Sequence, residues 1–191
     1  KADGSQVPCD FMNREDQGSG FSRGENFTRA SLGLKNAGSM HFILPDEGTS
    51  VEELLASPET LQEALSGGEE RSGTVTWKIP KFDQSSKRAL EASLQALGIE
   101  QAFTKGADFS GMSNETATPI WISSVTQESR VAIDEKGVVA AAYTEVGMDA
   151  GAAPIEDPDQ ADMILDRPFL YAITGPEGEL LFLGVCQDPT A

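Results

Sequence analysis

The sequence has few of the residues on which most catalytic, metal-binding and disulfide-built sites depend. It contains one histidine, two cysteines and 7% aromatic residues among 191 positions. Any Ser-His-Asp triad or histidine-ligated metal must therefore use His41. Two cysteines are too few for a disulfide scaffold, and Cys9 and Cys186 could pair or stay free. No apolar run reaches the roughly 20 residues that span a bilayer. We expect no cofactor, no metal site and no membrane partner.

Basic residues are also scarce relative to acidic ones. The chain has 14 Lys and Arg against 31 Asp and Glu, which gives a formal net charge of -17. A field of that sign repels nucleic acid and anionic membranes, and it makes a heparin-like polyanion an unfavourable partner. The 39% hydrophobic content is that of a globular protein, and a chain of this length can bury roughly 70% of its extended surface.

Three patterns invite a chemical interpretation, and each has a simpler one. Gly20-Phe21-Ser22-Arg23-Gly24 matches the nucleophile elbow of hydrolases, but polar residues precede it and a strand-like segment follows, so we expect a surface turn. His41 lies in an apolar run and is expected to be a hydrogen-bonded strand residue. Four acidic residues lack the glycine and spacing of a calcium loop and are expected to be solvated; they are Glu156, Asp157, Asp159 and Asp162. No catalytic residue is predicted.

The remaining patterns predict short strands and helices. A capping box at Thr49 and Glu52, and the pair Ser57-Pro58, predict two helix starts. Leu90, Leu94 and Leu97 predict an amphipathic helix over 86–97. Apolar runs separated by turn residues predict strands or hairpins over 27–34 with 39–44, over 75–79, over 120–133, and over 169–173 with 180–186.

The segment Glu135 to Thr144 alternates with the period of a β-strand. One face is small and mostly apolar and comprises Val138, Ala140, Ala142, Thr144, Val146 and Met148. From Gly147 to Asp162 the composition changes to Gly, Ala, Pro and acidic residues, which favour a loop. A strand pattern that continues into a loop with no evident partner predicts a loop that becomes a strand later.

Several segments, in the same order, resemble those of the serpin family. Met163–Ile173 fits the family's C-terminal signature, and the hinge-like alternation after Glu135 resembles the start of a reactive-centre loop. The other matching segments are Lys78–Phe82, Leu97–Ile99, Ala107–Gly111, Leu181–Gly184 and Asp188-Pro189. The resemblance covers essentially all 191 residues but only the family's C-terminal half.

The resemblance implies an α+β fold made of strands of sheets B and C, two strands of sheet A, a few short helices and an exposed reactive-centre loop. It divides a partial serpin domain into sheet strands and helices over 1–134, hinge and reactive-centre loop over 135–162, and C-terminal strand and hairpin over 163–191. Because a serpin is about twice this length, the chain is expected to be truncated and to be inactive alone.

The resemblance also implies a function, that of a suicide inhibitor of serine or cysteine proteases. The loop is cut and then inserts into sheet A, and many such proteins act outside the cell. Counting from Glu135 places the scissile bond at Gly151-Ala152, with Met148 and Ala150 as alternatives. Residues 137–162 lack Arg and Lys, so an elastase-like or other small-residue-preferring protease is expected rather than a trypsin-like one.

The hinge implied by the resemblance comprises Glu135, Gly137, Val138, Val139, Ala140, Ala141, Ala142 and Thr144. Lys81 is expected to pair with Glu135 where the loop leaves its strand, which would restrain premature insertion. The alternative is that these are two solvated surface charges. For the whole chain the alternative is a non-inhibitory serpin-fold binding or carrier protein.

Overall fold

The computed structural model describes residues 1, 3–35, 38–112, 119–135, 137–138, 141–142 and 159–190. The chain divides into two compact units. The main unit contains residues 1–83 and 131–191, and the small unit contains residues 84–130. No helix among the described residues is long and apolar enough to cross a membrane.

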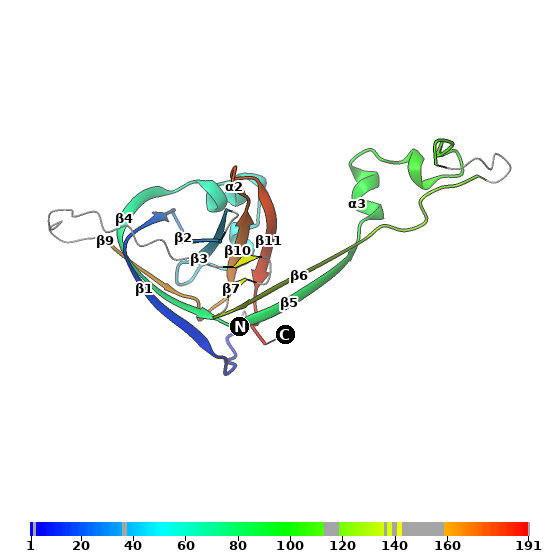
Figure 1. Cartoon of the computed structure of the whole chain (residues 1–191). Coiled ribbons are helices and arrows are strands. Elements are labelled where there is room, and N and C mark those ends of the chain that lie inside the picture. Colours follow the sequence, from blue (N-terminus) through cyan, green and yellow to red (C-terminus); the bar gives the residue numbers. More distant parts are fainter. Residues whose placement is uncertain are drawn as a thin grey trace. The chain divides into compact units, whose positions relative to one another are not determined.

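A mixed sheet forms the body of the main unit (Figure 1). In the described residues its strand order is β11-β10-β3-β2-β1-β4-β9, and every neighbouring pair is antiparallel except the parallel pair β4 and β9. The strands are β1 (Phe11–Arg23), β2 (Phe27–Gly33), β3 (Ser39–Pro45), β4 (Glu69–Pro80), β9 (Asp159–Ile164), β10 (Phe169–Thr174) and β11 (Leu180–Cys186).

A second sheet has the order β5-β6-β7-β8 in the described residues. Its long strands are β5 (Phe82–Ala89) and β6 (Thr126–Asp134), and its short ones are β7 (Gly137–Val138) and β8 (Ala141–Ala142). Only the beginning of β5 and the end of β6 belong to the main unit. At that end, Phe82, Val131 and Ile133 are buried in the main core.

Aromatic rings fill the centre of the main core. Phe42 on β3 lies edge-on to Trp77 on β4, with 5.8 Å between ring centroids, and is 6.1 Å from Phe169 on β10. Phe82 packs 6.1 Å from Phe169 and 5.3 Å from Tyr171. Offset and edge-on pairs of this kind add to the stabilisation from apolar burial. Three of the strands are therefore connected to β5 through stacked rings.

Two short helices cover a second apolar cluster in the main unit. They are α1 (Val51–Leu54) and α2 (Pro58–Ser66). The predicted start of α2 is confirmed: Ser57 is the N-cap, Pro58 opens the helix, and Thr60 completes a capping box. The start of α1 was predicted one residue early, because the capping box uses Ser50 and Glu53.

The predicted helix over 86–97 is wrong in its first half. Residues up to Ala89 belong to β5, and the helix α3 spans only Glu91–Ala96. None of its residues is buried, and Leu97 remains 79% exposed. Residues 86–89 are therefore extended because β5 forms hydrogen bonds with β6, although the leucine spacing is that of a helix.

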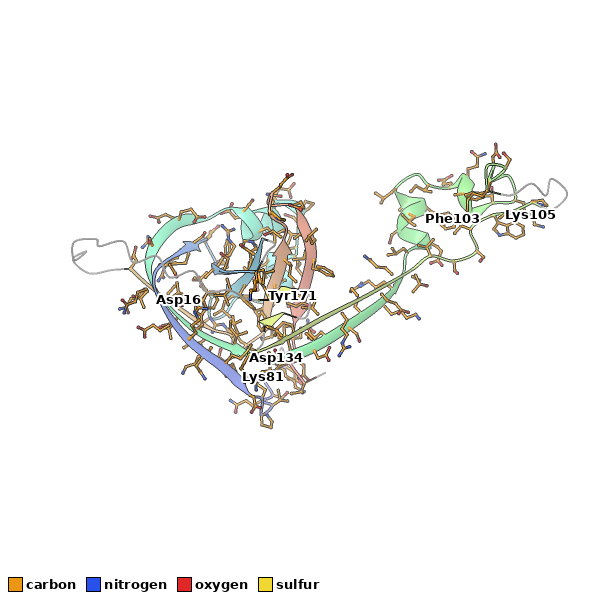
Figure 2. The ribbon with its side chains drawn as sticks, in the orientation of Figure 1. Asp16, Lys81, Phe103, Lys105, Asp134 and Tyr171 are labelled. Atoms are coloured by element: carbon orange, nitrogen blue, oxygen red, sulfur yellow. The ribbon has the colours of Figure 1, made fainter. Side chains whose placement is uncertain are left out.

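The small unit contains α3, a 3₁₀ turn η1 (Gln101–Phe103) and the outer parts of β5 and β6. The Leu90 amide donates to Val125 O at 2.9 Å, and the Val125 amide donates to Glu91 Oε1 at 2.8 Å. The Lys105 ammonium, labelled in Figure 2, lies 5.9 Å from the centre of the Trp121 ring. These contacts connect the helix and turn to the segment that enters β6.

Candidate functional site

Both ends of the predicted reactive loop lie in the described residues, while its middle does not. The strand β6 ends at Asp134, Glu135 is in a turn, and β7 and β8 follow. Val139, Ala140, Thr144 and all the scissile-bond candidates lie outside the described residues; the latter are Met148, Ala150, Gly151 and Ala152. The chain is described again from Asp159, so 159–162 form part of a strand rather than of the predicted loop.

The hinge backbone reverses direction twice. β7 pairs antiparallel with the end of β6, Ile133 opposite Val138 and Asp134 opposite Gly137. β8 then pairs antiparallel with β7, Val138 opposite Ala141. The sequence predicted one strand that continues past residue 133 without a partner. In the structure the chain instead turns back after β6, and β7 pairs with β6. Alternation alone carries no information about such a reversal.

Lys81 joins three segments at this hinge. Its Nζ lies 2.6 Å from Glu135 Oε1 and 3.7 Å from Asp10 Oδ2. The hydrogen bond to Glu135 is the main reason that the pKa of Lys81 is raised. The Lys81 amide also donates to Asp10 O at 2.9 Å. The structure therefore brings Lys81 and Glu135 together, and Figure 2 shows Lys81 beside Asp134, with which it lines a cavity.

The far end of the loop is held in the other sheet. β9 pairs in parallel with β4 from Gly73 opposite Asp159 to Lys78 opposite Ile164. Arg71 on β4 lies 3.4 Å from the Asp159 carboxylate, and Arg23 Nη2 donates to Gln160 O at 2.6 Å. The side chains that face inward on β9 are fully buried, with Ala161 and Met163 at most 1% exposed. The loop therefore follows a strand of the four-stranded sheet and is followed by a strand of the seven-stranded sheet.

An apolar cavity of about 280 Å³ lies beside the hinge. Most of its wall is apolar, and Asp134 and Glu135 belong to the wall as well. The apolar lining residues are Met12, Leu32, Leu34, Met40, Trp77, Ile79 and Ile133. A concave apolar site with a few polar groups has the composition of a small-molecule site.

The hydrolase-like candidates Ser22 and His41 line one cavity but form hydrogen bonds to different partners. Ser22 is buried at the end of β1, where it donates to Glu70 Oε1 at 2.6 Å and accepts from Arg29 Nη2 at 2.9 Å. The predicted surface turn is therefore wrong, because the buried Arg29 draws the serine inward. His41 instead bonds to Thr174 Oγ1 at 3.0 Å on β10. Its position as a hydrogen-bonded strand residue is as predicted.

Acidic side chains do not form a metal site within the described ranges. Asp159 and Asp162 lie on β9, whereas Glu156 and Asp157 are outside the described residues. No group of three or more His, Cys, Asp and Glu among the described residues is placed to hold a metal ion.

We expect His41 to make the main unit less stable in acid. Burial, and then the charge of Arg29, lower its pKa. The unfolded chain therefore binds a proton more readily than the folded one, so stability is present above about pH 6.5 and falls as pH drops through the lower folded pKa. Urea midpoints measured from pH 7.5 to pH 5 should fall less for His41→Gln than for the parent chain. Parallel curves for the two proteins would contradict this assignment.

Comparison with known proteins assigns the family. Residues 1–189 match the family described as Serpin (serine protease inhibitor). Iripin-2 of Ixodes ricinus is 36% identical over 147 residues, which cover 75% of this chain and 35% of that protein. Serpin-Z1B of Triticum aestivum is 30% identical over 198 residues, which cover 98% of this chain and 49% of the relative. This chain thus spans about half the length of such a relative.

Solved structures agree in fold. The native state of the thermophilic serpin tengpin superposes with a TM-score of 0.73 at 27% identity, covering 97% of this chain and 47% of that one. The thyroxine-binding globulin complex with thyroxine gives a TM-score of 0.73 at 28% identity, covering 99% and 48%. The α+β fold with few helices fits these relatives. The chain belongs to the serpin family of serine protease inhibitors.

Proposed function

We propose that this chain carries the reactive-centre loop of a serpin that inhibits an elastase-like or other small-residue-preferring serine protease. Membership of the serpin family supports inhibition at the family level. The pairing of β7 with β6 supports the loop's role more specifically. We infer an extracellular setting from the family resemblance alone.

The β6–β7 register is the observation on which this proposal rests. Ile133 lies opposite Val138, and the same register continued along β6 would place Ala140 opposite Val131. Residues directly opposite in an antiparallel pair share one face of the sheet. Val131 and Ile133 are 5% and 7% exposed, so this face points into the core. An inserting loop would therefore turn Val138 and Ala140 inward, which is the small apolar face of the sequence.

The composition of the loop supports the target class. Residues 137–162 contain no Arg or Lys, and the candidates Met148, Ala150, Gly151 and Ala152 are all small or unbranched. A narrow apolar specificity pocket accepts such side chains, whereas a trypsin-like pocket requires a cation. We therefore place the first cut within 148–152.

Digestion with elastase, and with trypsin as the matched control, tests this function. Mass spectrometry should find the first elastase cut within 148–152, with that stretch intact after trypsin. If the cut loop then adds to β6, hydrogen exchange of backbone amides over 126–132 should slow at least about tenfold, because a new strand protects a sheet edge. A first cut elsewhere, or unchanged exchange on β6, would overturn the proposal.

We also propose that this chain alone is cut without retaining the protease. In the described residues, the sheet that would receive the loop has β5 and β6 as its only long strands. An inserted strand would therefore gain a long neighbour on one side only. Denaturing gels after incubation with elastase should show cleaved chain and free enzyme. A complex that survives denaturant would contradict this proposal.

A binding or carrier role is the second candidate, and the apolar cavity beside the hinge favours it. One neighbour in structure, thyroxine-binding globulin, was solved with thyroxine. A carrier would bind an apolar fluorescent probe whose signal Met40→Gln abolishes, and cutting its loop would leave exchange on β6 unchanged. These two readouts separate the two functions.

Reversing either charge of the Lys81–Glu135 pair should loosen the hinge. Lys81→Glu places two carboxylates beside each other, and Glu135→Lys places two ammonium groups there, so amide exchange at Gly137 and Val138 should accelerate in each. The double variant should recover only part of this loss, because residue 81 would then face Asp10 with a like charge. High salt should shrink every difference. No recovery in the double variant would count against the pair.

A further inference from the structure

The two cysteines, far apart in sequence, line one cavity of the main unit. Cys9 precedes β1 and is half-buried, and Cys186 is the last residue of β11 and is 2% exposed. Both are free thiols. Each borders a cavity of about 250 Å³ between the segment before β1, the start of β10 and the residues after β11. The two side chains therefore border one shared space.

Backbone pairing and ring packing fix this neighbourhood. The residue after Cys9 accepts a hydrogen bond from the Lys81 amide at 2.9 Å, which places Cys9 close to β5. The first residue of β5, Phe82, packs on Phe169, and Phe169 lies directly opposite Cys186 in the β10–β11 pair. Three successive contacts thus connect one cysteine to the other.

Charged groups reinforce the same arrangement. Lys1 Nζ lies 2.7 Å from Asp188 Oδ2, which holds the segment before Cys9 against the residues after Cys186. Burial, and then Asp188 and Cys9, raise the pKa of the Cys186 thiol to about 12. Burial, Asp10 and Asp188 also raise the pKa of Cys9. The Cys186 thiol therefore responds to the charge of Cys9.

We propose that Cys9 and Cys186 form a reversible disulfide that fastens the segment before β1 to the last strand. A small disulfide such as oxidised glutathione supplies the oxidising equivalents. The Cys9 thiolate attacks one glutathione sulfur, the S–S bond breaks, and one glutathione thiolate leaves. The Cys186 thiolate then attacks the Cys9 sulfur and releases the second glutathione thiolate. Two cysteine thiols are oxidised, and one glutathione disulfide is reduced to two thiols.

The order of attack follows from exposure. Cys9 is the more accessible thiol and meets the oxidant first, whereas Cys186 is enclosed and reacts only with a sulfur already inside the cavity. Because the thiolate is the reactive form and both thiols resist deprotonation, the exchange should be slow at neutral pH. The product closes a covalent loop from residue 9 to residue 186, which restricts the unfolded chain.

Incubation with oxidised glutathione tests the bridge. Mass spectrometry should find the parent chain lighter by about two mass units, the two hydrogens lost on oxidation, at a rate independent of protein concentration. The melting temperature should rise by about 5–15 °C and return to its initial value with dithiothreitol.

Two single variants act as controls. Cys9→Ser changes the accessible thiol and should fold normally but show no thermal shift, and Cys186→Ala should stop at a mixed disulfide between Cys9 and glutathione. A stable mixed disulfide on the parent chain, a disulfide-linked dimer, or two thiols that stay free would each overturn the proposal.

Discussion

Replacing Trp77 by alanine should lower the free energy of unfolding by about 3–5 kcal/mol, the usual cost of removing a large buried aromatic side chain. Trp77 is 2% exposed on β4, which pairs with β1 on one side and β9 on the other. Its ring meets Phe42 edge-on, and its indole N–H donates to Asp16 Oδ2 at 3.1 Å. The alanine variant would lose the apolar burial and leave a cavity enclosed by rigid strands that cannot collapse around it.

Urea unfolding measures this loss, and the chain supplies its own control. The second of the two tryptophans, Trp121, is 40% exposed in the small unit, so Trp121→Ala should cost less than about 1 kcal/mol. Trp121→Phe leaves Trp77 as the sole tryptophan, whose fluorescence then reports on the main core. Equal losses for the two alanine variants would show that the core is not centred on Trp77.

Gly73→Ala should destabilise the fold by about 3 kcal/mol and weaken the attachment of β9. The two strands β4 and β9 are too close at Gly73 to accommodate a methyl group. Gly73 lies opposite Asp159 at the first parallel pair between β4 and β9. A Cβ on Gly73 would overlap the Asp159 carbonyl, which is backbone and cannot turn aside. The variant must therefore push β9, and with it the end of the loop, away from β4.

Gly20→Ala is the matched control on the neighbouring strand β1. There the new Cβ would come no closer than 3.9 Å to Arg71 O, an ordinary contact. Its stability should stay unchanged or rise by about 0.4–1 kcal/mol, because alanine restricts the unfolded chain. Thermal melts give the stabilities, and hydrogen exchange at Ala161 and Met163 reports the β4–β9 pairing. Normal protection of β9 in Gly73→Ala would refute the steric argument.

Local signals in the sequence predicted the elements that depend on local contacts. The hairpin of β2 and β3 and that of β10 and β11 form as expected, since each joins apolar runs across a turn. Ser57 and Pro58 start α2 for the same reason, because a cap and a first-turn proline act within a few residues. The family resemblance to serpins added the prediction that a protease cuts the loop after β6, which no local pattern contains.

Elements that depend on distant partners were missed. The long strand β1 looked polar, and its identity comes from eleven register pairs with β4 that no local pattern reveals. The end of β5 was predicted as helix because its pairing with β6 is likewise absent from the local pattern. At the candidate site, the alternating residues after Glu135 predicted extended backbone, but the reversal that lays β7 on β6 depends on the geometry of one turn.

Because the loop is attached to two sheets, the two pieces of the cleaved protein should remain bound to each other. The segment after the loop contributes β9, β10 and β11, and β10 lies hydrogen-bonded between β3 and β11 with its side chains buried. A single cut between 143 and 158 would therefore yield two polypeptides that stay associated through the strand pairs of this sheet. They should migrate as one particle through a sizing column and as two bands once detergent has unfolded them.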